Sequence, residues 1–257
     1  MLDHPFLASP LGIFLVLAVG GSLLYLSLAS LGYATFFVWK KDRFLPDYVA
    51  NPAELKKAIT WGLVSVVGNA VLTAPIHHAI VTGRSSVYYD LDERGLGYFV
   101  FSVAVYLFVT ETLVYWTHRA LHHPVLYKWI HLKHHEFRKP TPFAGVAFNP
   151  LDSFLQALPH HLCALFLPVH VGVYLTMLTF VTVWAVAIHD RVSLVRWSGL
   201  LYTGHHTIHH HYNKYNYGQF FSFWDRWAGT YKSPLDQPER FLLPRPLAET
   251  RPLAAAE

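Results

Sequence analysis

Apolar residues in this chain are gathered into long uncharged blocks, and this pattern restricts the fold more than any other feature. The first block, residues 10–39, contains no charged side chain. A soluble core needs dispersed apolar residues, whereas a transmembrane helix needs about 20 consecutive ones. The block is also too long for the apolar part of a signal peptide and has no Lys or Arg before it. We therefore predict that residues 10–39 form a first transmembrane helix.

Two further apolar segments, residues 58–81 and 97–116, are long enough to form a second and a third transmembrane helix. A fourth apolar segment, 154–188, is interrupted by Pro159 and Pro168. We predict that it forms a hairpin with its turn at residues 168–172, because Pro and Gly break helices. Each arm then has about 17 residues, roughly 26 Å of helix, so a shallow or re-entrant hairpin is expected.

The hairpin prediction rests on which side of the membrane the remaining segments occupy. With a hairpin, the segments 40–57, 117–153 and 189–257 all lie on one face, and they carry 18 of the 20 Lys and Arg residues. Cytosolic segments are enriched in these residues, so we predict that this face is cytosolic and that the N-terminus is outside. The net charge of +4 is explained by this topology and does not point to nucleic acid.

The chain is thus predicted to be a single all-α membrane domain with about four transmembrane passes or hairpin-forming helices and a cytosolic histidine-rich cap for two metals. Its parts are three transmembrane helices in residues 1–116, two histidine boxes in 117–153, the hairpin in 154–188, and a third box with a C-terminal tail in 189–257.

Histidines are concentrated in two stretches, residues 118–135 and 205–211, which hold 11 of the 18. Their spacing is HxxxH once, at His118 and His122, and then HxxHH twice. Residues three and four apart lie on one face of a helix, so each box can direct two or three imidazoles at one point. Cys163 is the only cysteine, so any metal must be held mainly by imidazole.

Nine imidazoles are predicted to converge on the cytosolic face as metal ligands. Nine exceed the four ligands of a zinc site but suit two metals of five or six coordination, with positions left open for oxygen or solvent. Imidazole binds Zn, Cu, Fe or Ni. Because the site lies at a lipid boundary, we expect chemistry on a lipid and two iron ions, with zinc as the expected replacement in purified protein. The nine are His118, His122, His131, His134, His135, His189, His206, His209 and His210.

Five further residues are candidates to support the ligands or to contact substrate: Glu111, His123, His161, Asp190 and His205. Glu111 lies within the third predicted span, where a carboxylate is costly and faces the protein interior. It either accepts a hydrogen bond from a ligand imidazole or pairs with a polar group between helices, and the same two roles are open to Asp190. His161 is either a ligand or part of a substrate channel. His123 and His205 point away from the shared face of their boxes, and His123 is also weighed as a further ligand.

Four stretches resemble the fatty acid hydroxylase and sterol desaturase superfamily. They are YWTHRALHHPVLYKWIHLKHH, KPTPFAGVAFNPLDSFLQALPHH, IHD and GHHTIHHHYNKYNYGQFFSFWDRWAGTYK, and they lie in a run from about Tyr115 to Lys232 that covers a little under half of the chain. The boxes indicate only the superfamily. PTPFA, LQALP and NYGQFF followed by WDR and GTY look most like the sterol C-5 desaturase branch.

The resemblance implies a membrane di-iron enzyme that introduces the C-5(6) double bond into a Δ7 sterol, using O2 and two electrons. The electrons are expected from NAD(P)H through cytochrome b5 or an equivalent carrier. The nine histidines map residue by residue onto the ligands of this family. The implied partners are a sterol or other lipid, an electron-transfer protein and the bilayer of the endoplasmic reticulum or of a bacterial inner membrane.

Two other functions remain open from the sequence. One is a hydroxylase of the same superfamily acting on a sterol methyl group, a fatty acyl chain or a carotenoid, because hydroxylation and desaturation share their first hydrogen abstraction. The other is a non-catalytic metal-binding membrane protein, for which a single tightly held zinc without oxygen consumption would be expected.

Overall fold

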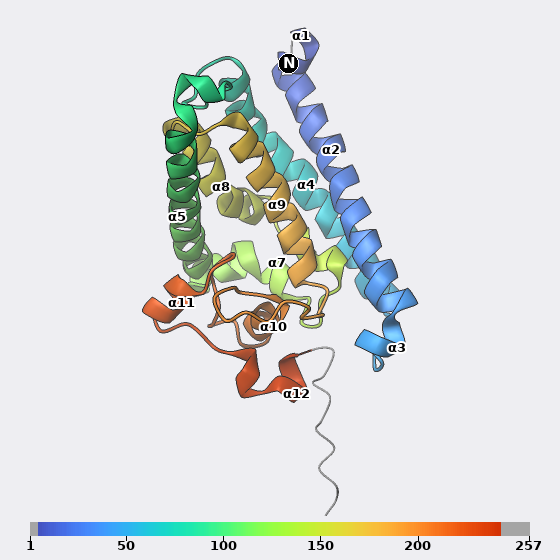
Figure 1. Ribbon diagram of the computed structural model, residues 1–257. Coiled ribbons are helices and arrows are strands. Elements are labelled where there is room, and N and C mark those ends of the chain that lie inside the picture. The colour runs from blue at the N-terminus through green and yellow to red at the C-terminus, as the bar shows by residue number, and fades with distance from the viewer. Residues whose placement is uncertain (1–4, 243–257) are drawn as a thin grey trace, which may run out of the picture.

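The computed structural model describes residues 5–242, a set of helices joined by loops (Figure 1). Four of these helices are long and apolar enough to cross a membrane. They are α2 (Pro10–Tyr33) with its π-helical continuation Ala34–Trp39, α4 (Pro52–Val81), α5 (Gly95–Leu121) and α9 (Val171–Ile188). The predicted all-α membrane fold with about four passes is confirmed. Residues 243–257 of the predicted tail lie outside the described residues.

The shorter helices gather mainly at one end of the long ones. Figure 1 shows α7 between the lower ends of α5 and α9, and α10, α11 and α12 below them, while α1 lies at the far end. Helix α5 ends in the first histidine box, and α7 and α10 carry histidines of the second and third boxes. All three boxes therefore lie at this end of the long helices. The short helices are α1 (Pro5–Ala8), α3 (Lys41–Phe44), α6 (Pro124–Leu126), α7 (Leu132–His135), α10 (Thr203–Tyr212), α11 (Phe223–Trp227) and α12 (Pro238–Phe241).

The starts of the long helices follow from local capping chemistry. Ser9 precedes α2 and its side chain accepts a hydrogen bond from Gly12 N at 3.1 Å, and Asn51 precedes α4 and accepts from Glu54 N at 3.2 Å. Each cap is followed by a proline, whose missing N–H has no helical partner to lose. Helix α4 therefore begins at Pro52, earlier than the apolar segment predicts. At its other end, α5 continues past residue 116 to Leu121. This extension keeps His118 on a transmembrane helix.

The long helices expose apolar side chains over much of their length. Leu11, Val19 and Leu23 of α2, Phe108 of α5 and Leu175 of α9 are all exposed. An exposed apolar surface of this extent is unfavourable in water but suits lipid hydrocarbon, in which the helices satisfy their own backbone hydrogen bonds.

The predicted hairpin corresponds to α8 (Pro150–Phe166) and α9, joined by residues 167–170. His170 caps α9, because its Nδ1 accepts from Gly172 N at 3.0 Å. Helix α8 has 17 residues and runs from Asp152, beside His131, to residues 167–170, which bond to Tyr88 in the loop between α4 and α5 at the other end of the bundle. It is packed against α4 and α5 and buries Asp152, His160 and His161. Its function is therefore to bring polar groups into the bundle.

A buried hydrogen bond and a close glycine contact hold the helices and the loop after α7 together. Tyr25 of α2 is fully buried, and its hydroxyl donates to the Phe143 carbonyl at 2.9 Å, which ties the PTPFA segment to the bundle. Gly68 of α4 faces the first residue of α8, and a Cβ at Gly68 would lie 2.5 Å from Pro150 Cβ. The contact between α4 and α8 therefore requires glycine at this position.

Gly68→Ala is expected to destabilise the protein by about 1–3 kcal/mol, because the added methyl overpacks against the rigid Pro150 ring. The matched control is Gly20→Ala in α2, where nothing lies within 4 Å of the added Cβ. Thermal unfolding midpoints of the three proteins in one detergent measure the difference. Equal midpoints for the two variants would contradict the close packing of α4 on α8.

Candidate metal centre

Two groups of imidazoles lie next to each other at the end of the bundle where the short helices gather. Within each group, one ring nitrogen from every residue lies within 4.8 Å of the others. The His118 group contains His118, His122, His131, His135 and His209, and the His134 group contains His134, His189, His206 and His210. The structure thus brings together all nine ligands predicted from the sequence and divides them between two positions.

Neighbouring histidines on one helix serve different groups. His134 and His135 end α7, and His209 and His210 lie near the end of α10. In both pairs the first and second residue point to different groups. The His135 and His210 ring centroids are 4.7 Å apart, so the two groups are in contact through these helices.

Hydrogen bonds at Nδ1 orient four of the nine rings. His118 Nδ1 lies 2.8 Å from Tyr217 O, His189 Nδ1 2.5 Å from Ala185 O, and His209 Nδ1 2.8 Å from Tyr215 O. Because a carbonyl only accepts, each Nδ1 carries the hydrogen and each Nε2 presents a lone pair. A hydrogen bond of this kind, from Nδ1–H to a carbonyl, fixes the tautomer of a metal-binding histidine.

The fourth oriented ring is His131, whose partner is a carboxylate that the sequence analysis did not single out. His131 Nδ1 lies 2.7 Å from Asp152 Oδ2, and Gln156 Nε2 donates to Asp152 Oδ1 at 2.8 Å. Both His131 and Asp152 are completely buried. The signal in the sequence was an acidic residue in the first turn of the hairpin helix, four positions before a glutamine.

Inner nitrogens in each group approach one another to about 3 Å. His189 Nε2 lies 2.9 Å from His206 Nε2, 3.2 Å from His210 Nε2 and 3.3 Å from His134 Nε2. In the other group, His135 Nε2 lies 3.1 Å from the Nε2 atoms of both His131 and His209, and both of those atoms carry lone pairs. A single N–H cannot serve all of these contacts, so lone pairs face one another. Metal ions between them fit this donor set.

Burial keeps the ligand imidazoles neutral. It lowers the pKa of His189 to about 4, and together with the neighbouring imidazoles it holds the pKa of His134, His135, His206, His209 and His210 well below the usual 6.5. A neutral imidazole is the form that binds metal, so the site needs no deprotonation near neutral pH.

Glu111 and Asp225 hold the segment that follows the third box. Glu111 accepts from Phe220 N at 3.2 Å and from Phe221 N at 3.0 Å, so its partners are backbone amides between helices and not the ligand imidazole that was one of its two predicted roles. Asp225 accepts from Tyr217 N at 2.9 Å and from Gly218 N at 2.8 Å. Both carboxylates are buried, so residues 217–221 are fixed from two sides.

The other predicted site residues lie around the two groups but not in them. Asp190 accepts from Val192 N at 2.7 Å, and burial raises its pKa to about 7. His205 Nε2 lies 3.1 Å from the Tyr231 hydroxyl, and His161 Nδ1 lies 2.7 Å from the Tyr174 hydroxyl inside the bundle. His123 is exposed at the start of α6. These contacts leave the nine histidines as the candidate ligand set.

A cavity of about 70 Å³ adjoins both groups. Its polar end includes ligand histidines, and its apolar wall comes from α5 and α9 and includes Val114, Val181 and Ile188. The ring of Phe148 lies on this wall and stacks on His134 with centroids 4.1 Å apart. A hydrocarbon placed here has its carbons beside the imidazole groups.

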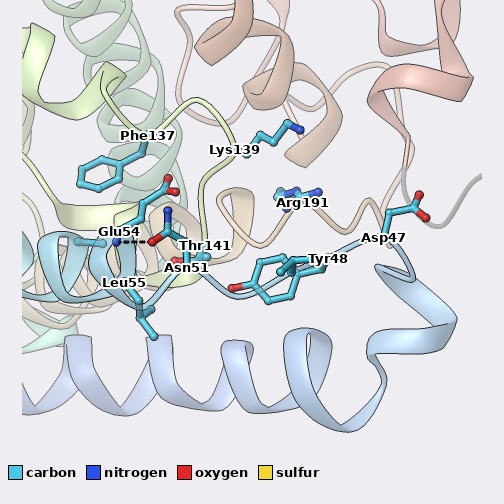
Figure 2. A pocket seen from close by; sticks show the side chains of 11 residues that line it. Asp47, Tyr48, Asn51, Glu54, Leu55, Phe137, Lys139, Thr141 and Arg191 are labelled. Carbon is cyan, nitrogen blue, oxygen red and sulfur yellow. Dashed lines mark hydrogen bonds between the residues drawn. The ribbon is translucent and has the colours of Figure 1, made fainter.

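A second cavity, of about 230 Å³, lies between the start of α4, the loop after α7 and the loop after α9 (Figure 2). Figure 2 shows the polar side chains of Asn51, Glu54 and Arg191 around it, with Asn51 Oδ1 bound to Glu54 N. None of the nine histidines lines this cavity. Because the imidazole groups line only the smaller of the two cavities, that cavity is the candidate site of reaction.

Long apolar helices above two groups of buried imidazoles define a membrane protein of the histidine-box class. The family model for fatty acid hydroxylases matches residues 103–230. Lathosterol oxidase of Homo sapiens is 37% identical over 232 residues, which cover 87% of this chain and 76% of that protein. Delta(7)-sterol 5(6)-desaturase of Eremothecium gossypii is 40% identical over 234 residues, which cover 90% of this chain and 66% of that protein. No solved structure matches the chain.

The chain belongs to the fatty acid hydroxylase family, and proteins named lathosterol oxidase and Delta(7)-sterol 5(6)-desaturase are among its relatives. The resemblance stated from the sequence motifs is therefore confirmed.

Asp152→Asn is expected to weaken metal binding about 10- to 100-fold, because the carboxylate that orients His131 loses its charge. The control is Glu136→Gln, which removes a carboxylate that pairs with Lys57 and Lys133 at the surface. Metal retained against a graded chelator, measured by mass spectrometry of the eluted metal, compares the two. Equal retention would mean that Asp152 does not support the centre.

Proposed function

We propose that the protein is a membrane desaturase that introduces the C-5(6) double bond into a Δ7 sterol. The observation that carries this proposal is the pairing of two imidazole groups with an apolar-walled cavity, in a chain 37% identical to a lathosterol oxidase and 40% identical to a Delta(7)-sterol 5(6)-desaturase. The cavity supplies the contact with hydrocarbon, and the imidazoles supply the ligands for a redox metal.

Two iron ions are the proposed metals, one held by each group, with zinc as a replacement in purified protein. Five and four imidazoles suit metals of five or six coordination with open positions. When bound, iron supplies the four-electron reduction of O2 to two waters, with two electrons taken from the C-5 and C-6 hydrogens and two from an external donor. Two protons from solvent complete this balance.

The chain's own residues orient the site and exclude water from it. Asp152 and the carbonyls of Ala185, Tyr215 and Tyr217 hold four imidazoles with their lone pairs inward. Val114, Val181 and Ile188 line the cavity with hydrocarbon that solvates sterol rings and not water. A dry site limits side reactions of activated oxygen.

The external electrons are proposed to come from NAD(P)H through cytochrome b5 or an equivalent carrier on the cytosolic face. Basic residues support this sidedness, because 18 of the 20 Lys and Arg residues fall in segments at the histidine end in the predicted topology. The proposed location is the endoplasmic reticulum or a bacterial inner membrane.

Expression in a yeast strain that lacks its own C-5 desaturase is expected to convert accumulated Δ7 sterols to 5,7-dienes. Sterol extracts analysed by gas chromatography and mass spectrometry, with an empty vector as control, measure the conversion. Δ7 sterols that persist while the protein is present in the membrane fraction would refute the proposal.

His134→Ala is expected to abolish diene formation while leaving membrane insertion intact, because it removes a ligand from the smaller group. The matched control is His123→Ala, since His123 is an exposed histidine outside both groups. Diene yield is normalised to the protein in the membrane fraction. Full turnover by His134→Ala would remove this residue from the ligand set.

A lipid hydroxylase is the second candidate, favoured by the match to the fatty acid hydroxylase family model. It differs in outcome only after the first hydrogen abstraction. The same yeast extracts distinguish the two, since a hydroxylated lipid without a 5,7-diene supports the hydroxylase.

A further inference from the structure

Sterol chemistry places a hydroxyl group beside the reacting carbons. This inference rests on the proposed function. In a sterol only C-4 separates the C-3 carbon, which carries the hydroxyl, from C-5. When C-5 and C-6 face the imidazole groups, the 3-hydroxyl must therefore lie in the same cavity. A buried hydroxyl that makes no hydrogen bond costs free energy, so the cavity needs a polar partner for it.

Few side chains around this cavity are free to be that partner. The ligand imidazoles face one another across the metal positions. Trp184 Nε1 donates to Gln219 O at 2.9 Å, the Tyr217 hydroxyl donates to Asn213 O at 3.3 Å, and Gln156 Nε2 donates to Asp152. Gln219 Oε1 is buried and accepts no hydrogen bond of standard geometry from the described residues. His160, whose Nδ1 lies 2.8 Å from the Tyr106 hydroxyl, makes a hydrogen-bond contact of looser geometry with the Gln219 side chain. This contact leaves the N–H groups of the Gln219 amide, which lines the cavity, for a ligand.

The backbone around Gln219 is fixed relative to the metal ligands. Glu111 binds the amides of Phe220 and Phe221, Trp184 binds the Gln219 carbonyl, and Asp225 binds the amide of Gly218. Two residues before Gln219, the carbonyl of Tyr217 accepts from His118 Nδ1 at 2.8 Å. One short segment therefore holds both a ligand imidazole and the Gln219 side chain. A group bound to Gln219 has a defined position relative to the His118 group.

We propose that Gln219 binds the 3-hydroxyl of the substrate and thereby selects free 3-hydroxysterols over sterols that lack this hydroxyl or carry it as an ester. The primary amide of Gln219 has two N–H donors, and one of them can donate to the oxygen of the 3-hydroxyl. Binding at C-3 also sets the register that presents C-5 and C-6 to the metal groups.

The test compares lathosterol with its 3-deoxy analogue in membranes of the yeast strain that lacks a C-5 desaturase, with NADH supplied. The wild-type protein is expected to prefer lathosterol by at least about tenfold in kcat/KM, because the analogue leaves Gln219 unpaired. Gln219→Met keeps the length of the side chain and removes its hydrogen bonds. It is expected to lower kcat/KM for lathosterol at least about tenfold and to leave the value for the 3-deoxy analogue within about threefold of wild type.

Gln156→Met is the matched control, because Gln156 also lines the cavity but is bound to Asp152. It is expected to change both substrates by the same factor. Equal use of the two sterols by the wild-type protein would overturn the inference without any variant. So would an equal loss on both sterols in Gln219→Met, or a loss of preference in Gln156→Met alone. A wild-type protein that converts neither sterol would refute the proposed function itself, and the inference with it.

Discussion

The structure depends on nine imidazoles that are packed into two groups with nitrogen lone pairs facing one another. Lone pairs that face one another repel unless a cation lies between them. Hydrogen bonds at the outer nitrogens of His118, His131, His189 and His209 force lone pairs inward, where Nε2 atoms from different helices approach to about 3 Å. Burial then keeps the rings in the metal-binding form, as the lowered pKa values of the box histidines outside the spans show. Metal binding and folding are therefore linked, since metals that bind this arrangement add their binding free energy to its stability.

The bundle provides the geometry for this site. Helix α5 extends beyond its apolar part to deliver His118, α9 ends next to His189, and the turn after α8 returns the chain so that α10 lies beside α7. Helix α8 runs beside α4 and α5 and supplies Asp152 at the histidine end. The membrane helices thus act as the scaffold, and the chemistry lies in the short elements that connect and follow them.

The sequence was sufficient for the helices and for the set of grouped histidines, because both depend on local rules. Apolar length predicted the first three candidate spans, and α9 as one arm of a hairpin. The four-residue spacing predicted that His118 and His122, His131 and His135, and His206 and His210 act together, whereas histidines three apart lie in different groups. It was not sufficient for partners separated by many residues. Asp152 is 21 positions from His131, and Glu111 is 109 positions from Phe220. These pairings are set by helix packing, which leaves no periodic trace in the sequence.

The division of His134 from His135, and of His209 from His210, between the two groups has a consequence for how the protein can vary. A single residue inserted into α7 or α10 rotates the following side chains by about 100°. Such a change would misdirect ligands of both metal positions together. The lengths of these two short helices are therefore far more constrained than the loops around them, because a change in either length affects both metal positions.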